Sequence, residues 1–369
     1  MKGHNECTGC FACQAVCTQN AIEILEDKDG FYYPSIKSDA CIKCGQCSRI
    51  CNKTDVFYSP KEILCVQYNN EQLLSNATSG GIIAALADAV IKSGGTTIGV
   101  QYDNVDNGAL WTAIDDVDRI PSIQGSKYFQ VPLTNNIYKL VEEKLKTGKV
   151  LFVGTPCQVA SMVRVAGCDN LITVDLVCGG TASQLLEKRY LEFLVDSTGR
   201  KVKQHYFRKK VSGWSKDYYS KILFQNGEEK NYKGFDDLFN YAYNSGNCMR
   251  ESCYNCQFTK NERVGDFTVG DAWGIKAEDV KEFDIHNGTS LVLINSSKAQ
   301  NLIAELNGSV YIHLANEQLL KSNKPLFSRM PRRKVRDISY LLINKMPLKK
   351  AVRLVNYRYT LKKLVRRGM

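Results

Sequence analysis

The sequence lacks any long hydrophobic run. No stretch of the 369-residue chain reaches the roughly 18 uninterrupted apolar residues that a membrane-spanning helix requires. The first ten residues, MKGHNECTGC, contain no apolar core ahead of the first cysteine, so we expect no secretory signal. With 44% hydrophobic and 10% aromatic residues, the chain also lacks the composition of a disordered protein. We therefore expect a cytoplasmic protein with two or three domains.

Acidic residues are scarce at the end of the chain. Residues 329–369 contain 14 Lys or Arg and the single acid Asp337, which gives a local charge of +13. The whole chain carries +11, so residues 1–328 sum to −2. Apolar residues of this segment recur at helical spacing, at Leu348, Val352, Val355 and Tyr359.

This pattern predicts a basic amphipathic helix in residues 329–369, for which three interpretations stay open. The helix packs on the body with its charges solvated, or it docks on a partner or peripherally on the inner face of a membrane. Binding to nucleic acid is the least favoured of the three, because no motif that reads a groove accompanies the charge.

Cysteine, in contrast, is abundant, with 15 residues. One spacing, C-x2-C-x2-C-x3-C, occurs twice near the N-terminus. The eight cysteines are Cys7, Cys10, Cys13, Cys17, Cys41, Cys44, Cys47 and Cys51. This spacing is typical of 4Fe-4S ligation, in which the fourth cysteine of each run binds the other cluster.

The crossed pattern assigns each cluster three cysteines from one run and one from the other. The first cluster would be held by Cys7, Cys10, Cys13 and Cys51. The second would be held by Cys41, Cys44, Cys47 and Cys17. Disulfides are disfavoured in a chain without an export signal, and zinc would want paired C-x2-C units with longer gaps between them.

The two runs resemble the two-cluster bacterial ferredoxin domain, which we expect to occupy residues 1–58. That family usually has Pro after each fourth cysteine, whereas this chain has Thr18 and Asn52. Because proline donates no ligand, the difference concerns the stiffness of the loop.

The segment at 60–185 alternates strand and helix patterns. Buried strands are predicted at 63–68, 96–102, 149–154 and 171–177, with helices over 80–95 and 134–149. This alternation predicts an α/β domain. For residues 186–328 we expect an α+β region, with a helix near 182–196 and a hairpin turn at Asn226-Gly227.

Short motifs in these two regions fall on glycine-rich turns or at strand ends, where α/β proteins bind ligands. They are ATSGG (77–81), QGSKYFQ (124–130), GTPCQ (154–158), DLVCGG (175–180) and CMRESCYNCQF (248–258), the last followed by VGDFTVGDAWG (264–274). Each motif is weak by itself. The pair Cys253-x2-Cys256 fits a redox dithiol, half a zinc site, or part of a third cluster with Cys157 and Cys178.

In this order, the motifs resemble the beta subunit of coenzyme F420 (8-hydroxy-5-deazaflavin) hydrogenases and dehydrogenases. The resemblance covers residues 60 to about 300, and is greatest to bacterial members from polysaccharide-biosynthesis clusters. It implies an FAD that passes electrons between a hydride carrier and iron–sulfur clusters. The flavin-site residues it implies are Ser79, Gly80, Gly81, Ser126, Lys127, Tyr128, Thr155, Pro156, Cys157 and Gln158.

The resemblance also implies a third 4Fe-4S cluster close to the flavin. Its ligands would be Cys178, Cys253 and Cys256, with Cys157 or Cys248 as the fourth. Three functions stay open. The chain is an FAD and iron–sulfur oxidoreductase acting on a small molecule, or an electron-transfer subunit that serves a partner enzyme. The third is a non-redox binding module with structural zinc.

Overall fold

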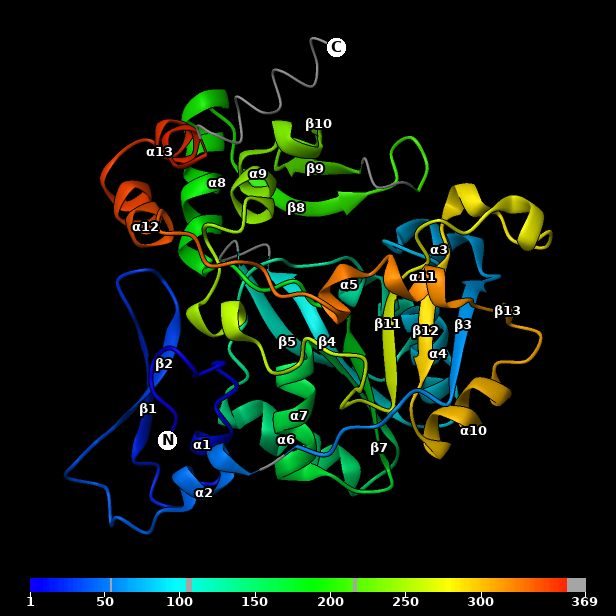
Figure 1. The fold of residues 1–369 in the computed structure, drawn as a ribbon, viewed down its shortest axis with the longest axis horizontal. Coiled ribbons are helices and arrows are strands. Elements are labelled where there is room, and N and C mark those ends of the chain that lie inside the picture. Colours follow the sequence, from blue (N-terminus) through cyan, green and yellow to red (C-terminus); the bar gives the residue numbers. More distant parts are fainter. Residues whose placement is uncertain (54, 104–107, 215–217, 357–369) are drawn as a thin grey trace.

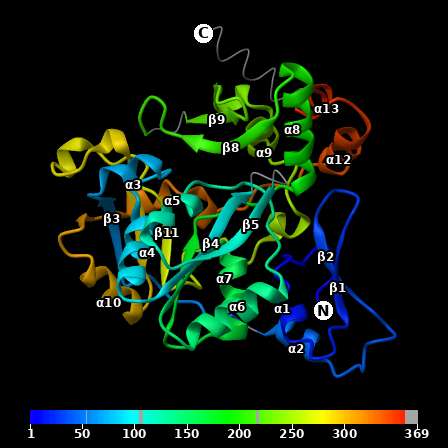
Figure 2. The ribbon, with the colours of Figure 1, turned by 180° about the vertical axis from the view of Figure 1, so that it is seen from behind.

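The structure is a computed structural model that describes residues 1–53, 55–103, 108–214 and 218–356. Figure 1 shows three parts: a small N-terminal domain, a large central sheet with helices on both faces, and a smaller sheet with its own helices. Seen from behind, the N-terminal domain lies against the helices of the central part (Figure 2). The fold is a mixed α/β structure with an N-terminal ferredoxin-type domain.

The N-terminal domain pairs two short helices with one hairpin. The strands β1 (Ile22–Glu26) and β2 (Tyr32–Ile36) are antiparallel, and the helices are α1 (Ala12–Ala15) and α2 (Gln46–Asn52). Asp27 closes the hairpin turn, since its carboxylate accepts a hydrogen bond of 2.9 Å from the backbone N–H of Phe31. The ring of Phe31 is fully buried.

The central sheet has eight strands in the order β13-β3-β12-β11-β7-β6-β4-β5. Four neighbouring strands, β11, β7, β6 and β4, are parallel, and the others join antiparallel. The strands are β3 (Glu62–Tyr68), β4 (Thr96–Asp103), β5 (Gly108–Ile114), β6 (Val150–Gly154), β7 (Leu171–Leu176), β11 (Phe267–Asp271), β12 (Ser290–Ile294) and β13 (Val310–Leu314). All four strands predicted for residues 60–185 are confirmed.

Helices cover both faces of this sheet. They are α3 (Glu71–Asn76), α4 (Ile82–Lys92), α5 (Ile120–Ile123), α6 (Asn135–Leu145), α7 (Pro156–Ala166), α10 (Ser297–Glu305) and α11 (Glu317–Lys321). Side chains alternate between the faces along β6: Val150 and Phe152 join the core under α6 and α7, while Leu151 joins the core under α4 and α10. Both predicted helices of this region are confirmed.

The predicted boundary near residue 185 does not separate two sheets. Strands β11, β12 and β13 follow it in the sequence but complete the central sheet beside β3 and β7. The separate part, built from residues within 184–244, is a three-stranded antiparallel sheet with flanking helices. Its elements are α8 (Gln184–Thr198), β8 (Val202–Lys209), β9 (Tyr219–Phe224), β10 (Glu229–Lys233) and α9 (Leu238–Asn244). The predicted turn at Asn226-Gly227 joins β9 and β10, with Gly227 at a φ of 86°.

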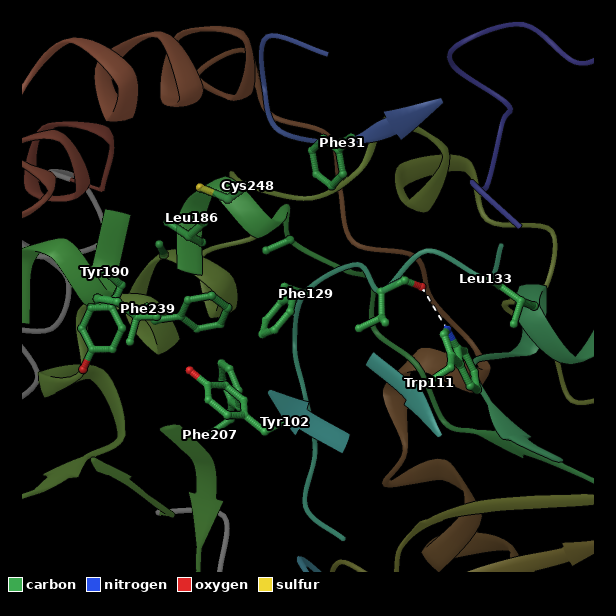
Figure 3. Packing of buried hydrophobic residues seen from close by; sticks show 14 of the residues in the cluster. Phe31, Tyr102, Trp111, Phe129, Leu133, Leu186, Tyr190, Phe207, Phe239 and Cys248 are labelled. Atoms are coloured by element: carbon green, nitrogen blue, oxygen red, sulfur yellow. Dashed lines mark hydrogen bonds between the residues drawn. The ribbon is translucent and has the colours of Figure 1, made fainter. Parts of the chain in front are cut away.

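One hydrophobic cluster joins the three parts. Figure 3 shows Phe31 from the N-terminal domain, Phe129 and Trp111 from the central part, and Phe207 and Phe239 from the smaller sheet in one core. The indole N–H of Trp111 donates to the carbonyl of Val131 at 3.4 Å, so its polar edge is satisfied. The cysteine-rich domain is therefore fixed by apolar packing to the parts that carry the other motifs.

The basic tail forms two helices in its described part, α12 (Arg336–Lys345) and α13 (Leu348–Val355). Leu348 and Val352, two residues of the predicted apolar face, are each 2% exposed and join the cluster beside α8 and α9. Tyr359 lies outside the described residues. Packing against the body thus covers the described face. Among the described residues, no helix is both long and apolar enough to cross a membrane.

Candidate iron–sulfur and flavin sites

The first predicted set of N-terminal cysteines comes together around α1. The charges of Cys10, Cys7 and Cys51 all act on the thiol of Cys13, which is 7% exposed. We call these four residues the inner quartet. Burial and the neighbouring thiols raise the pKa of Cys13, so four thiolates would be unstable here without positive charge. Iron supplies that charge in a thiolate-bound cluster, and the donor set fits one.

The second predicted set lines a cavity of about 210 Å³ in the same domain. Cys17, Cys41, Cys44 and Cys47, which we call the outer quartet, lie on its wall. Apolar Ile36 and Ile42 also line it. Cys44 is exposed, and α2 begins directly after Gly45, which adopts a left-handed φ of 76°. Four soft donors around one apolar cavity also fit a cluster.

A third quartet forms between the central sheet and the segment after α9. The thiol of Cys157, at the start of α7, is acted on by the charges of Cys178, Cys256 and Cys253. Burial raises the pKa of all three of Cys157, Cys178 and Cys253, to about 11 for Cys178 and about 12 for Cys253. Cys178 follows β7, and Cys253 lies in a short 3-10 helix, η3 (Glu251–Asn255).

Cys248, the other candidate for fourth ligand, lies elsewhere. It is 1% exposed, packs in the hydrophobic cluster near Leu186 (Figure 3), and is flanked by Arg336 and Asp29. Burial raises the pKa of its thiol to about 12. None of the other cysteines is among its electrostatic neighbours, so the geometry favours Cys157 as the fourth member of the third quartet.

Structural zinc is the alternative interpretation of the C-terminal cysteines. Within the described ranges, no three His, Cys, Asp or Glu side chains converge as ligands of a single metal ion. Zinc holds its sulfurs about 2.3 Å from one centre, which requires closely grouped thiolates. A 4Fe-4S cluster is also held by four cysteine thiolates, and each of the three quartets offers that donor set.

Gly180 and the buried acid Asp175 hold the segments of the third quartet. The backbone N–H of Gly180 donates to the Cys178 sulfur at 3.4 Å, and a Cβ at Gly180 would lie 3.0 Å from the sulfur of Met249. Asp175 is bonded to the guanidinium of Arg263 at 2.6 Å and accepts the backbone N–H of Gly265 at 2.9 Å. These contacts tie the end of β7 to the loop before β11.

Several residues predicted for the flavin site have structural roles. The Lys127 amine donates to the carbonyls of Val100, Ile123 and Gln124 at 2.7, 3.3 and 3.0 Å, and burial lowers the pKa of Lys127 to about 7. It faces inward, toward these three carbonyls. Thr155 and Gln158 form the capping box of α7, in which Pro156 is the first residue.

The ATSGG motif lies at the start of α4, against β3 and β12. A Cβ at Gly80 would lie 2.3 Å from the carbonyl oxygen of Val66, so only glycine allows this approach. Gly81 adopts a φ of 80° as the N-cap of α4. The hydroxyl of Ser79 donates to the carbonyl of Thr289 at 2.8 Å, and the Ser79 carbonyl accepts the amine of Lys210 at 2.7 Å.

Aromatic rings and a cation lie between this motif and the third quartet. Tyr128 stacks on Tyr243 at 4.7 Å, and the Tyr243 hydroxyl donates to the carbonyl of Gly180, two residues after Cys178. Further residues of this group, which we call the aromatic shell, are Arg208, Trp214, Tyr218 and Trp273. The sequence motifs included Tyr128 and Trp273 but missed the others. The Tyr- and Lys-rich composition near 203–219 was a signal for Arg208, Trp214 and Tyr218 but not for Tyr243.

Asp271 orders the far side of the aromatic shell. Its carboxylate accepts two hydrogen bonds from the Arg208 guanidinium, at 2.7 and 3.1 Å, and one from the Trp214 indole at 3.1 Å. The rings of Trp214 and Trp273 stack at 4.6 Å, 7° from parallel. Flat rings beside a fixed cation suit a planar, anionic cofactor such as a flavin nucleotide. Ser126 makes no contact that bears on this fit.

Comparison with known protein families supports this arrangement. Residues 147–318 match the family model for the C terminus of the coenzyme F420 hydrogenase/dehydrogenase beta subunit, and residues 6–54 match the 4Fe-4S dicluster domain. The first match spans the predicted boundary near residue 185, as the shared central sheet does. The predicted resemblance to this family and to a dicluster ferredoxin domain is confirmed.

Two curated proteins are similar to part of the chain. The chain is 28% identical over 168 residues to a subunit of the F(420)H(2) dehydrogenase of Methanosarcina mazei, which is 42% of this chain and 47% of the relative. It is 25% identical over 198 residues, 45% of this chain and 54% of the relative, to an uncharacterized protein of Methanocaldococcus jannaschii. The chain thus matches about half the length of these curated relatives.

A solved structure shows the same fold. The chain is similar to one in the F420-reducing [NiFe] hydrogenase complex from Methanosarcina barkeri, with a TM-score of 0.51 and 16% identity. The similarity covers 74% of this chain and 92% of that one.

Proposed function

We propose that this iron–sulfur protein of the F420 hydrogenase/dehydrogenase beta-subunit type is an FAD-dependent oxidoreductase. It would pass electrons between a hydride carrier, coenzyme F420 or another small molecule, and three 4Fe-4S clusters. The observation that carries the proposal is the third quartet. Cys157, Cys178, Cys253 and Cys256 come from three segments far apart in the sequence, and they meet between the N-terminal domain and the aromatic shell.

The flavin would lie at the aromatic shell. Bound FAD would supply the conversion between two-electron hydride chemistry and single electrons. Tyr128 and Tyr243 offer stacked rings on the side of the third quartet, and Arg208, held by Asp271, offers a fixed positive charge. Because the Lys127 amine is bonded to three backbone carbonyls, we assign the phosphate contact to other groups and Lys127 to holding the loop.

A second candidate is an electron-transfer protein that serves a partner enzyme and has no substrate of its own. Its support is the relative from Methanosarcina mazei, which is named as part of a dehydrogenase, and the similarity to a chain within a hydrogenase complex. A role in cell-surface polysaccharide biosynthesis stays a prediction. The two candidates differ in whether the purified chain alone oxidises a soluble hydride donor.

The test is a matched pair of cysteine substitutions in protein purified without oxygen. Cys157→Ala should lower the iron content by about four per chain, because it removes one ligand of the third quartet. Cys248→Ala, a substitution of the same size in the buried core, should keep its iron. Equal iron content in both variants and the wild type would contradict the third cluster. Flavin retained by the wild type with no turnover of any hydride donor would favour the second candidate.

A further inference from the structure

Arg250 links the third quartet to the N-terminal domain. Its backbone N–H donates to the carbonyl of Thr181 at 3.0 Å, and its own carbonyl accepts the N–H of Cys253 at 3.0 Å. Its side chain is fully buried and extends the other way, toward the inner quartet. No feature of the sequence motifs singles it out.

The guanidinium of Arg250 lies directly against Cys7. Its Nε donates to the Cys7 carbonyl at 2.8 Å, and its Nη2 donates to the Cys7 sulfur at 3.8 Å. The other acceptors are Oε1 of Gln130 at 3.0 Å and the carbonyl of Tyr32 at 3.1 Å. The ring of Tyr33 stacks beneath it, 4.0 Å from the guanidinium carbon.

Arg250 differs from the other buried arginines in having no carboxylate. Arg263 is paired with Asp175, Arg208 with Asp271, and Arg336 with Asp29 and Glu251. Among the described residues, no acid is bonded to Arg250, and the thiol of Cys7 is the one ionisable group that accepts from its guanidinium. A buried cation without a counter-charge is costly, so this site requires a negative partner. Four thiolates of a bound cluster would provide it.

Gly9 makes the approach possible. It adopts a φ of 68°, and a Cβ there would lie 2.3 Å from Nε2 of Gln130 and 3.0 Å from the guanidinium carbon of Arg250. The loop between Cys7 and Cys10 therefore leaves space for the cation at the one position where a side chain would block it.

We propose that Arg250 is the counter-charge of the inner cluster and raises its reduction potential. Reduction adds negative charge, which burial disfavours. A fixed cation and a hydrogen bond to a ligand sulfur both favour the reduced form, and such contacts are known to set cluster potentials. Arg250 thus offsets the effect of burial at the inner quartet. The inference rests on the proposed function only in that the inner quartet holds a cluster.

Gln130→Glu is the sharpest variant, because it neutralises Arg250 without removing it. Oε1 of Gln130 accepts from Arg250 and from the N–H of Tyr32, and a glutamate retains this acceptor. In the part of the chain that the structure describes, Nε2 of Gln130 has no hydrogen-bond partner, so the substitution removes no bond there. Arg250→Gln removes the positive charge itself. Arg250→Lys keeps the charge but lacks the planar guanidinium group with its several N–H donors.

The readout is a potentiometric titration of the anaerobically purified full chain, followed by electron paramagnetic resonance. Gln130→Glu and Arg250→Gln should lower the midpoint potential of a single cluster by at least about 59 mV. For a one-electron reduction this is a tenfold change in the equilibrium constant. The remaining waves should shift less, because the charge of Arg250 acts on Cys253 of the third quartet but its guanidinium is bonded to Cys7 of the inner quartet, and Arg250→Lys should stay near the wild type. Gln130→Glu protein that lacks about four irons per chain, with the other waves unchanged, would also support the inference. It would show that a single cluster depends on the positive charge of Arg250.

Two results would overturn the inference. One is a Gln130→Glu protein with full iron content and unshifted waves. The other is a uniform shift of every wave or loss of every cluster, which would indicate a purely structural role. Absence of iron from the wild type would instead contradict the proposed function, so the two failures are distinguishable.

Discussion

The inner and outer quartets share one cysteine spacing but lie in different surroundings. Cys13 of the inner quartet is 7% exposed, Cys10 has its carbonyl bonded by Tyr138 of α6, and Cys7 is bonded by Arg250. The outer quartet lines an open cavity, with Cys44 exposed and Ile42 63% exposed beside it. The cysteine repeat determines which residues ligate, whereas the rest of the chain determines the charge and solvent around each site. We expect the outer quartet to meet external partners and the inner quartet to face the rest of the protein.

The largest expected difference comes from removing one ligand at each site. Cys13→Ala and Cys44→Ala should each lower the iron content by about four per chain. Only Cys13→Ala should also lower the melting temperature strongly, because Cys13 is buried and lies on α1, which contacts α6 and α7. Iron analysis and calorimetry measure both effects. An equal decrease in melting temperature in the two variants would contradict the proposed difference between the inner and outer quartets.

Chelation should separate the same two sites kinetically. Cys44 of the outer quartet is exposed, whereas Cys13 of the inner quartet is buried, so a chelator under oxidising conditions should release iron in two phases. About four irons should leave several-fold faster than the rest. In Cys44→Ala protein the fast phase should be missing. A single phase in the wild type would mean that the two sites are equally accessible.

A substitution of Arg164 tests how strongly the segment around the inner quartet is held against the central part. From α7, its guanidinium donates to the carbonyl of Ile50 at 3.0 Å and is paired with Asp55 at 3.3 Å. Arg164→Met should lower the free energy of unfolding by about 1–3 kcal/mol, since it leaves a carbonyl and a carboxylate without their cation. Denaturant unfolding measures this change. The control is Lys144→Met on α6, which breaks an ion pair with the exposed Asp115 and should cost under about 1 kcal/mol.

The smallest expected effect concerns the surface of the outer quartet. Residues 36–53 contain Lys37, Lys43, Arg49 and Lys53 but one acid, Asp39. A redox partner with an acidic surface should therefore associate with this surface faster than a neutral partner. Lys43→Glu should slow its electron exchange a few-fold at low salt in stopped-flow measurements.

Lys92→Glu is the control for this surface prediction. It changes the net charge equally but lies on α4, away from the N-terminal domain (Figure 1). It should leave the exchange rate unchanged. Equal slowing by both variants would indicate an effect of net charge alone.

Local sequence pattern predicted the elements well but not their assembly. The strands at β3, β4, β6 and β7 and the hairpin at Asn226-Gly227 follow from periodicity and turn residues, which act over a few positions. The addition of β11–β13 to the central sheet depends on pairing between strands far apart in the sequence, such as Leu291 with Cys65 and His313 with Cys65. Nothing in a local window specifies such register.

The candidate sites show the same division. Spacing was sufficient to assign the inner and outer quartets, because the ligands follow a short repeat. The choice between Cys157 and Cys248, the inward direction of the Lys127 amine and the approach of Arg250 to Cys7 all depend on tertiary packing. Motif residues in glycine-rich turns also serve the fold, as the capping box of Thr155 and Gln158 shows.

The most direct measurement of the central proposal is the content of iron, acid-labile sulfide and flavin in protein purified without oxygen. Three quartets and the aromatic shell predict about twelve irons, a matching amount of sulfide and about one FAD per chain. About eight irons with no flavin, even after FAD is added back, would contradict the proposal. The chain would then combine a dicluster ferredoxin domain with a domain that carries no redox centre.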